Sequence, residues 1–140
     1  MNIGGCSGII RILQTKKEGD NMTFYNSNGK PIAYLADDEV HIFLFNGKPV
    51  AYLYDEAVYG FNGHHLGWFE DGWIRDLRGK CAFFTEEANG SGPVKPVKGV
   101  KPVKSVKKVK PVKSVKQTKR TKAVNSLSWS ELSNEQFFEQ

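Results

Sequence analysis

The sequence predicts an all-β domain of four sequential β-hairpins, followed by a disordered lysine-rich tail and a short C-terminal helix. About eight short antiparallel strands with pseudo-four-fold symmetry are expected. Three observations predict this fold: a glycine recurs at the turns, apolar columns recur around it, and the charge changes sign where the repeats end. A single hairpin is marginal in water, so each hairpin must bury one face against its neighbours.

Residues 1–21 precede the repeats and form a predicted N-terminal extension with a possible strand at Ile9–Leu13. Two interpretations stay open: an extension ahead of a working start at Met22, or an ordered edge strand. Cys6 and Cys81 make no disulfide framework and no metal-ligand spacing, which favours a reducing, cytoplasmic compartment. No segment has the roughly 20 apolar residues of a membrane helix, so no membrane span is expected.

The four-hairpin domain is predicted over residues 22–90, and its repeat is clearest at the turns. The turn glycines are 18, 16 and 16 residues apart. Asparagine precedes the first three and arginine the fourth. Asn-Gly predicts a two-residue type I′ turn, because both residues tolerate positive φ. The turn dipeptides are Asn28-Gly29, Asn46-Gly47, Asn62-Gly63 and Arg78-Gly79.

Further columns line up on these glycines. Positions three and five residues after the glycine share one strand face, because side chains alternate. Both are apolar or aromatic in every repeat, so both are predicted to point into a common core. An acidic column follows, either as surface turns, the simpler interpretation, or as a cation-binding ring. The columns are Ile32, Val50, Leu66 and Ala82, then Tyr34, Tyr52, Trp68 and Phe84, then Asp37, Asp55, Asp71 and Glu87.

The repeat resembles the bacterial domain called the 4-fold beta flower. The resemblance rests on the four glycine-centred hairpins and on aromatic-acidic runs such as Tyr52–Asp55 and Trp68–Trp73. It covers residues 22 to about 87. The Pro-Val-Lys tail and the end containing Ser, Trp and Phe are also similar to that family's usual C-terminal half. The resemblance implies the fold, and it implies no activity and no functional residues.

Residues 91–122 form a predicted flexible linker that contains eight x-Val-Lys triplets. Proline blocks helix, and no aromatic or acidic residue is present to build a core. In a polyproline II helix the lysines form one stripe and the valines another. Three interpretations stay open: a solubilising spacer, an arm that binds nucleic acid or another polyanion, or valines that dock along the surface of the four-hairpin domain. The polyanion hypothesis uses Lys95, Lys98, Lys101, Lys104, Lys107, Lys110, Lys113, Lys116, Lys119, Arg120 and Lys122.

Residues 123–140 form a predicted C-terminal aromatic docking segment. Capping boxes at Ser128–Glu131 and Ser133–Gln136 predict one or two helical turns. Exposed aromatic side chains are costly, so we expect docking onto the chain's own four-hairpin domain or onto an unknown protein partner, with a frayed end as the alternative. The docking residues are Trp129, Leu132, Phe137 and Phe138.

The charge is divided unevenly between the two parts of the chain. Residues 1–92 hold eight basic and twelve acidic residues, and residues 93–140 hold twelve and three. No nucleophile motif, metal-ligand spacing or cofactor motif is present. The sequence therefore predicts a non-enzymatic binding or scaffold module with a tethered C-terminal docking peptide and no cofactor. The alternative is an accessory protein that binds nucleic acid or another polyanion through the tail, and a small enzyme or effector is the third hypothesis.

Overall fold

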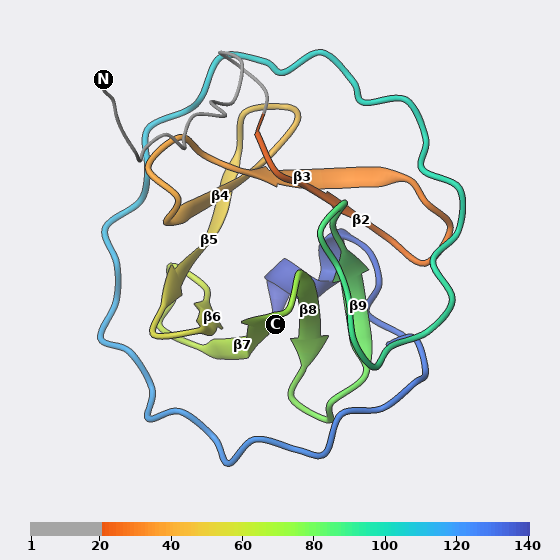
Figure 1. The fold of residues 1–140 in the computed structure, drawn as a ribbon. Helices are drawn as coiled ribbons and strands as arrows, with labels where there is room; N and C mark the ends of the chain where they lie inside the picture. The colour runs from red at the N-terminus through yellow and green to blue at the C-terminus, as the bar shows by residue number, and fades with distance from the viewer. Residues whose placement is uncertain (1–20) are drawn as a thin grey trace, which may run out of the picture.

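The computed structural model describes residues 21–140, and its eight strands close into an antiparallel barrel (Figure 1). Neighbours in the sheet are neighbours in the sequence, and β9 pairs with β2 to close the ring. The predicted all-β fold of four hairpins is confirmed. The expected extension, Asn21 apart, and Cys6 lie outside the described residues. The strands are β2 (Thr23–Tyr25), β3 (Pro31–Leu35), β4 (His41–Leu44), β5 (Pro49–Tyr54), β6 (Ala57–Tyr59), β7 (His65–Glu70), β8 (Trp73–Asp76) and β9 (Cys81–Phe84).

The glycine turns differ from the predicted type I′ geometry. In the first hairpin the Gly29 N–H donates to the Asn26 carbonyl, and the Asn26 N–H donates to the Lys30 carbonyl, both at 2.9 Å. Gly29 has a φ of 81°, whereas Asn28 keeps negative φ. A type I turn followed by a glycine bulge explains this pattern, so the type I′ prediction is wrong. Positive φ at both central residues occurs instead in the acidic turns Asp55-Glu56 and Asp71-Gly72.

A β-bulge in every hairpin changes which side chains face the core. Ala33 pairs with Phe24 and Pro31 pairs with Tyr25, so Ile32 is the extra residue. The bulge interrupts the alternation of sides along the strand. The column three residues after the glycine therefore faces inward, but the column five residues after it lies on the outer surface. The prediction that both columns face the core is wrong for the second. The equivalent extra residues are Val50, Leu66 and Ala82.

The barrel core is completed by the C-terminal segment. A short 3-10 helix, η1 (Glu135–Glu139), lies across one end of the barrel and inserts Phe137 and Phe138 into the core (Figure 1). We call η1 with these two side chains the plug. The capping box predicted at Ser133–Gln136 does not form: the Ser133 hydroxyl donates instead to the Ala82 carbonyl at 2.6 Å. Residues 21–140 contain no helix with the length and apolar character needed to cross a membrane.

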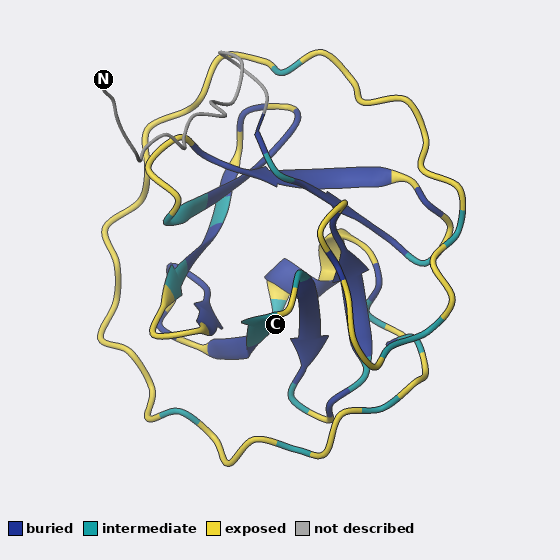
Figure 2. Ribbon diagram, viewed as in Figure 1, coloured by how far each residue is buried: buried dark blue, intermediate teal, exposed yellow. Residues whose placement is uncertain are grey.

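Residues 93–126 encircle the barrel as an extended segment, which we call the belt (Figure 1). The belt contains no helix or strand, but its backbone donates hydrogen bonds to the turns of all four hairpins. Most of its residues are exposed, whereas the strands beneath are largely buried (Figure 2). The expected flexible linker of residues 91–122 is thus laid against the barrel and does not extend away from it.

Candidate functional site

The belt contacts the barrel in a nine-residue register. At each hairpin a belt N–H donates to the carbonyl of the turn glycine, at 2.7 to 3.0 Å, and successive donors are nine residues apart. In a polyproline II helix, every third residue points in the same direction. Nine residues are three full turns, so each donor points toward the barrel as the previous one does. The donor and acceptor pairs are Gly99 with Gly29, Lys108 with Gly47, Gln117 with Gly63, and Ser126 with Gly79.

The placement of proline follows this register in the two middle units of the belt, whereas Pro96 of the first unit stands at the position of Ser105. The Ser105 N–H donates to the Phe45 carbonyl at 2.8 Å, and Ser114 repeats this bond in the next unit. Pro102 and Pro111, which have no N–H, occupy the stretches between turns, where the belt makes no backbone bond to the described part of the barrel. In these two units, the residues that face a barrel carbonyl therefore have a backbone N–H, and proline stands where no carbonyl is bonded.

The turn glycines are required both by their own backbone and by the belt. Gly47 has a φ of 93°, a conformation that favours glycine. A Cβ atom on Gly47 would overlap the Val106 carbonyl oxygen of the belt. The other three turns repeat this contact, so the belt approaches each hairpin where a side chain is missing. The three further contacts are Gly29 with Val97, Gly63 with Val115, and Gly79 with Val124.

Belt lysines turn inward onto aromatic rings that lie between the hairpins. The Lys104 ammonium lies 4.9 Å from the centre of the Tyr34 ring, and the Lys113 ammonium lies 4.6 Å from the centre of the Tyr52 ring. The two lysines are nine residues apart, and the two rings are equivalent in the repeat. Tyr34 also stacks on Phe43 with ring centres 6.1 Å apart. Each lysine thus makes a cation–π contact with an outer aromatic pair.

Most residues of the polyanion hypothesis contact the barrel through their side chains. Some are ion-paired, as Lys101 is with Glu86 at 3.5 Å. Among residues 21–140, the side chains of Lys98, Lys110 and Arg120 form no hydrogen bond, ion pair or cation–π contact. The hypothesis itself stays a prediction, but any polyanion must compete with the barrel for the other eight. These are Lys95, Lys101, Lys104, Lys107, Lys113, Lys116, Lys119 and Lys122.

The belt valines point to solvent. Their exposed fractions run from 88 to 94%. The interpretation in which valines dock on the barrel is therefore wrong: the lysine stripe faces inward and the valine stripe faces outward. The exposed valines are Val94, Val97, Val100, Val103, Val106, Val109, Val112, Val115 and Val124.

Arg75 holds both ends of the belt, and sequence reasoning missed it. Its side chain is 1% exposed. Nη1 donates to the carbonyls of Gly79 and Ser126 at 2.7 and 2.8 Å, and Nη2 donates to the Ser91 carbonyl. One guanidinium therefore binds both Ser91, which lies just before the belt, and Ser126, which is the last belt residue. The sequence did contain a signal for it: arginine stands at a position that is aromatic in the other three hairpins. The equivalent residues are Tyr25, Phe43 and Tyr59.

Five buried side-chain polar atoms have no hydrogen-bond partner among residues 21–140, and besides His41 Nε2 and Arg75 Nε there are three that share one repeat position beneath the belt. They are Tyr34 Oη, Tyr52 Oη and Trp68 Nε1, at equivalent positions of three hairpins. Burial raises the pKa of both tyrosines, so their hydroxyls stay protonated and able to donate. Each unpaired buried polar group costs about 1–3 kcal/mol. We call the barrel surface that the belt covers the belt groove. Its three unpaired polar atoms show that the belt does not satisfy every polar group beneath it.

The predicted docking residues all contact the barrel of the same chain. The Phe138 ring stacks on Phe83 with centres 5.4 Å apart, inside the barrel. The Trp129 ring meets Trp73 at 6.1 Å on the outer surface. Of the two surfaces left open by the sequence, the structure shows contact with the chain's own barrel. The four residues are Trp129, Leu132, Phe137 and Phe138.

Titratable groups near the belt serve structural contacts. Burial raises the pKa of the Cys81 thiol to about 11, so it is protonated. Burial lowers the pKa of His65, whose Nδ1 accepts the Arg120 N–H at 3.1 Å. Residues 21–140 contain no group of three or more side chains placed to hold a metal ion. The acidic column lies on exposed outer turns, at Asp37, Asp55, Asp71 and Glu87.

One of these acidic turns contains a strongly perturbed carboxylate. Burial would raise the pKa of Asp38, but hydrogen bonds from the backbone and ring of His41 and from the Val40 N–H outweigh it and lower the pKa to about 2. Asp38 Oδ1 accepts the backbone N–H groups of Val40 and His41 at 2.9 and 3.0 Å. It therefore acts as a turn cap.

The family model described as 4-fold beta flower protein matches residues 22–138. The matched range contains the barrel and the whole belt, and it reaches into η1, so the belt is part of the family's domain. Comparison with curated proteins gave no match. Comparison with solved structures gave none either.

Proposed function

The chain belongs to the 4-fold beta flower family, and from the geometry of its belt groove we propose that it is a non-enzymatic peptide-binding module. The barrel binds an extended segment that carries lysine at every third residue, and its own belt fills the groove in cis. The observation that carries this proposal is the nine-residue register between belt N–H groups and turn carbonyls.

The groove has the features of sites that bind polyproline II segments. Such sites present aromatic rings to a preformed extended peptide and bind its backbone through a few hydrogen bonds. Here the turn glycines supply the carbonyl acceptors, and outer rings such as Tyr34 and Tyr52 receive the lysines. The unpaired hydroxyls of these two tyrosines favour a ligand that offers them hydrogen-bond partners.

The competing hypotheses make different demands on the belt. A solubilising spacer needs neither a register nor lysines that face inward. A polyanion-binding arm needs exposed ammonium groups, yet eight of its eleven proposed residues contact the barrel. We therefore rank the binding of nucleic acid or another polyanion second.

The proposal is tested by supplying the belt in trans. The host is the full-length chain with residues 93–122 replaced by a Gly/Ser sequence of the same length, which retains the plug. A fluorescent peptide of residues 93–122 is expected to bind this host saturably, measured by anisotropy. The control peptide lacks one residue from each nine-residue unit, so its donors fall out of step with the turns. It is expected to bind at least about tenfold more weakly, because about 1 kcal/mol is lost at each missed hydrogen bond.

Equal binding of the two peptides would contradict the proposal, since only charge and composition would then be recognised. Retention of the natural chain on single-stranded DNA measures the alternative. Salt-sensitive retention that disappears when the belt is replaced would favour the polyanion hypothesis.

A further inference from the structure

Three pockets of the structure share one pair of repeat positions around the barrel. Each pocket lies where a glycine turn meets the belt and the C-terminal segment. Each is lined by the residue before a turn glycine and by one belt residue, and these belt residues are nine positions apart. The pairs are Asn46 with Pro102, Asn62 with Pro111, and Arg78 with Arg120, in cavities of about 180, 270 and 430 Å³.

The copy at the fourth hairpin differs from the others at both of these positions. Arg78 replaces the asparagine of the other turns, and Arg120 replaces the proline of the other belt units. Lys80, which directly precedes β9, also lines this pocket. The two departures from the repeat lie in segments about forty residues apart in the sequence, yet both add a cation to the same cavity. This coincidence distinguishes the pocket from a generally basic surface.

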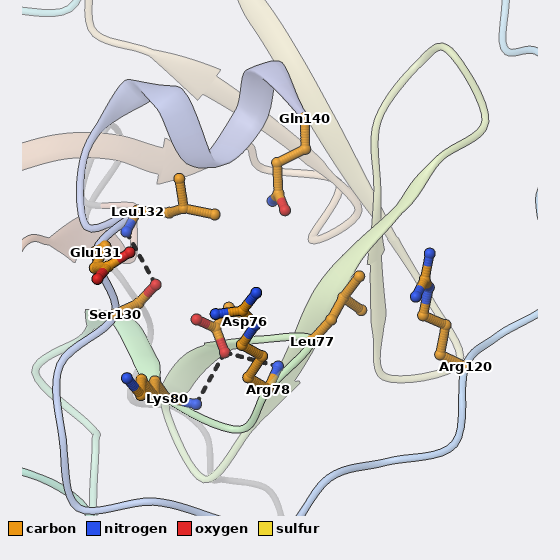
Figure 3. Close-up of a pocket in the computed structure, with 9 residues that line it drawn as sticks. All are labelled: Asp76, Leu77, Arg78, Lys80, Arg120, Ser130, Glu131, Leu132 and Gln140. Carbon is orange, nitrogen blue, oxygen red and sulfur yellow. Dashed lines mark hydrogen bonds between the residues drawn. The ribbon is translucent and has the colours of Figure 1, made fainter.

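Within residues 21–140, no ion pair joins the three cations of this pocket to its two acids, Asp76 and Glu131. Among residues 21–140, the side chains of Arg78, Lys80 and Arg120 form no hydrogen bond or ion pair. Asp76 Oδ1 accepts the backbone N–H groups of Arg78 and Lys80, both at 2.9 Å, so this carboxylate oxygen is used within the turn. Glu131 lies on the opposite side of the pocket from Arg120 (Figure 3).

We propose that this fourth-hairpin pocket binds a small anion that carries two or more phosphate groups. Arginine pairs with phosphate in a bidentate geometry that lysine and asparagine cannot reproduce. Figure 3 shows Lys80, Arg78 and Arg120 spread across the pocket and not gathered at one point, which suits an elongated anion. The cavity falls within the roughly 300–1,000 Å³ of small-molecule sites. This function is separate from recognition of the belt.

The test is calorimetric titration of the full-length protein with tripolyphosphate at low salt. We expect saturable binding of one tripolyphosphate per chain. Arg78→Asn and Arg120→Gln should each weaken it at least about tenfold, because each removes a charged hydrogen-bond donor. Arg78→Asn restores the residue of the other turns, and Arg120→Gln keeps the N–H that His65 accepts. Both variants should therefore fold.

A charge-matched variant separates this pocket from diffuse attraction. Asn46→Arg combined with Arg78→Asn moves one arginine to the second hairpin and leaves the net charge unchanged. We expect this variant to lose binding as Arg78→Asn does. Binding retained by the double variant, an absence of saturable binding to the natural chain, or inorganic phosphate binding as tightly as tripolyphosphate would each overturn the proposal.

Discussion

The barrel and the belt share one four-fold repeat, yet they keep their places by different interactions. A hairpin of the barrel spans 16 or 18 residues, and the matching belt unit spans nine. The barrel buries aliphatic and aromatic side chains around a common axis. The belt exposes its valines and is held by turn carbonyls, by aromatic rings and by a few acids.

This difference separates stability from recognition. A buried apolar side chain contributes about 1.5–3 kcal/mol, whereas a cation–π contact at an exposed site contributes about 0.5–1 kcal/mol. Substitutions in the barrel or the plug should therefore unfold the protein. Substitutions in the belt should loosen the belt while the barrel stays folded.

The largest effect is expected at the plug, which follows the belt in sequence but shares the barrel core. Phe137 is fully buried and packs edge-on against Phe83 with ring centres 5.5 Å apart. Phe137→Ala should lower the free energy of unfolding by about 3–5 kcal/mol, because it leaves a cavity. Chemical denaturation followed by tryptophan fluorescence measures this. Leu127 lies between the belt and the plug and is 65% exposed, so Leu127→Ala should change the free energy of unfolding by less than about 0.5 kcal/mol. An equal loss of stability in the two variants would mean that the plug, like the belt, contributes little to the stability of the barrel.

The next effect is expected at Arg75, where barrel and belt are joined. Arg75→Met removes the donors to the Ser91 and Ser126 carbonyls and should cost about 1–3 kcal/mol. Hydrogen exchange should accelerate at the Ser126 amide, which pairs with Gly79. Arg78→Met is the control, because that exposed side chain has no partner among residues 21–140. Unchanged exchange at Ser126 in Arg75→Met would show that the belt ends are held by other contacts.

The barrel could be predicted from local sequence, but the facing of its side chains could not. Each turn glycine predicted a hairpin, and the alternation of side chains correctly placed Ile32 inward. The same rule placed Tyr34 inward and failed, because the bulge at Ile32 adds one residue to the strand. A bulge depends on the pairing of two strands, so the column of one strand does not reveal it.

The belt could not be predicted as a surface-bound segment, because its contacts depend on the geometry of the whole barrel. The triplets predicted a lysine stripe, and this stripe is present. Its inward facing depends on rings such as Tyr34 that the bulges turn outward. A weak signal did exist: Pro102 and Pro111, and likewise Ser105 and Ser114, are nine residues apart. Only the four-fold barrel explains why a three-residue pattern should also repeat every nine.

A smaller effect should separate the cost of a turn from the cost of displacing the belt. Gly47→Ala and Gly90→Ala both place alanine at positive φ, at 93° and 77°, which costs about 1–2 kcal/mol. Only the Cβ at Gly47 overlaps the belt; at Gly90 the nearest atom, Asp71 Oδ2, is 4.0 Å away. Hydrogen exchange at the Lys108 amide should therefore accelerate in Gly47→Ala alone. Equal exchange in both variants would mean that the belt does not depend on the bare turn.

A still smaller effect is expected from the lysines. Lys113→Gln removes the cation 4.6 Å from the Tyr52 ring and should ease local opening of the belt by about 0.5–1 kcal/mol. Exchange at the Ser114 and Gln117 amides measures this opening. Lys113→Arg should restore protection, because arginine keeps the cation. Lys110→Gln is the matched control, and an equal response in that variant would assign the effect to net charge.

The last effect belongs to an outer turn away from the glycine turns that hold the belt, and it depends on pH. The Asp38 pKa is lowered from 3.8 to about 2, so the folded state favours the carboxylate. The stabilisation it provides is complete above pH 3.8 and is lost as the pH falls toward 2. Asp38→Ala should therefore be less stable than the natural chain at pH 5, and the gap should narrow as the pH falls to 2, as measured by denaturation at each pH. A gap that stays constant down to pH 2 would mean that the Asp38 side chain stabilises this turn without its charge.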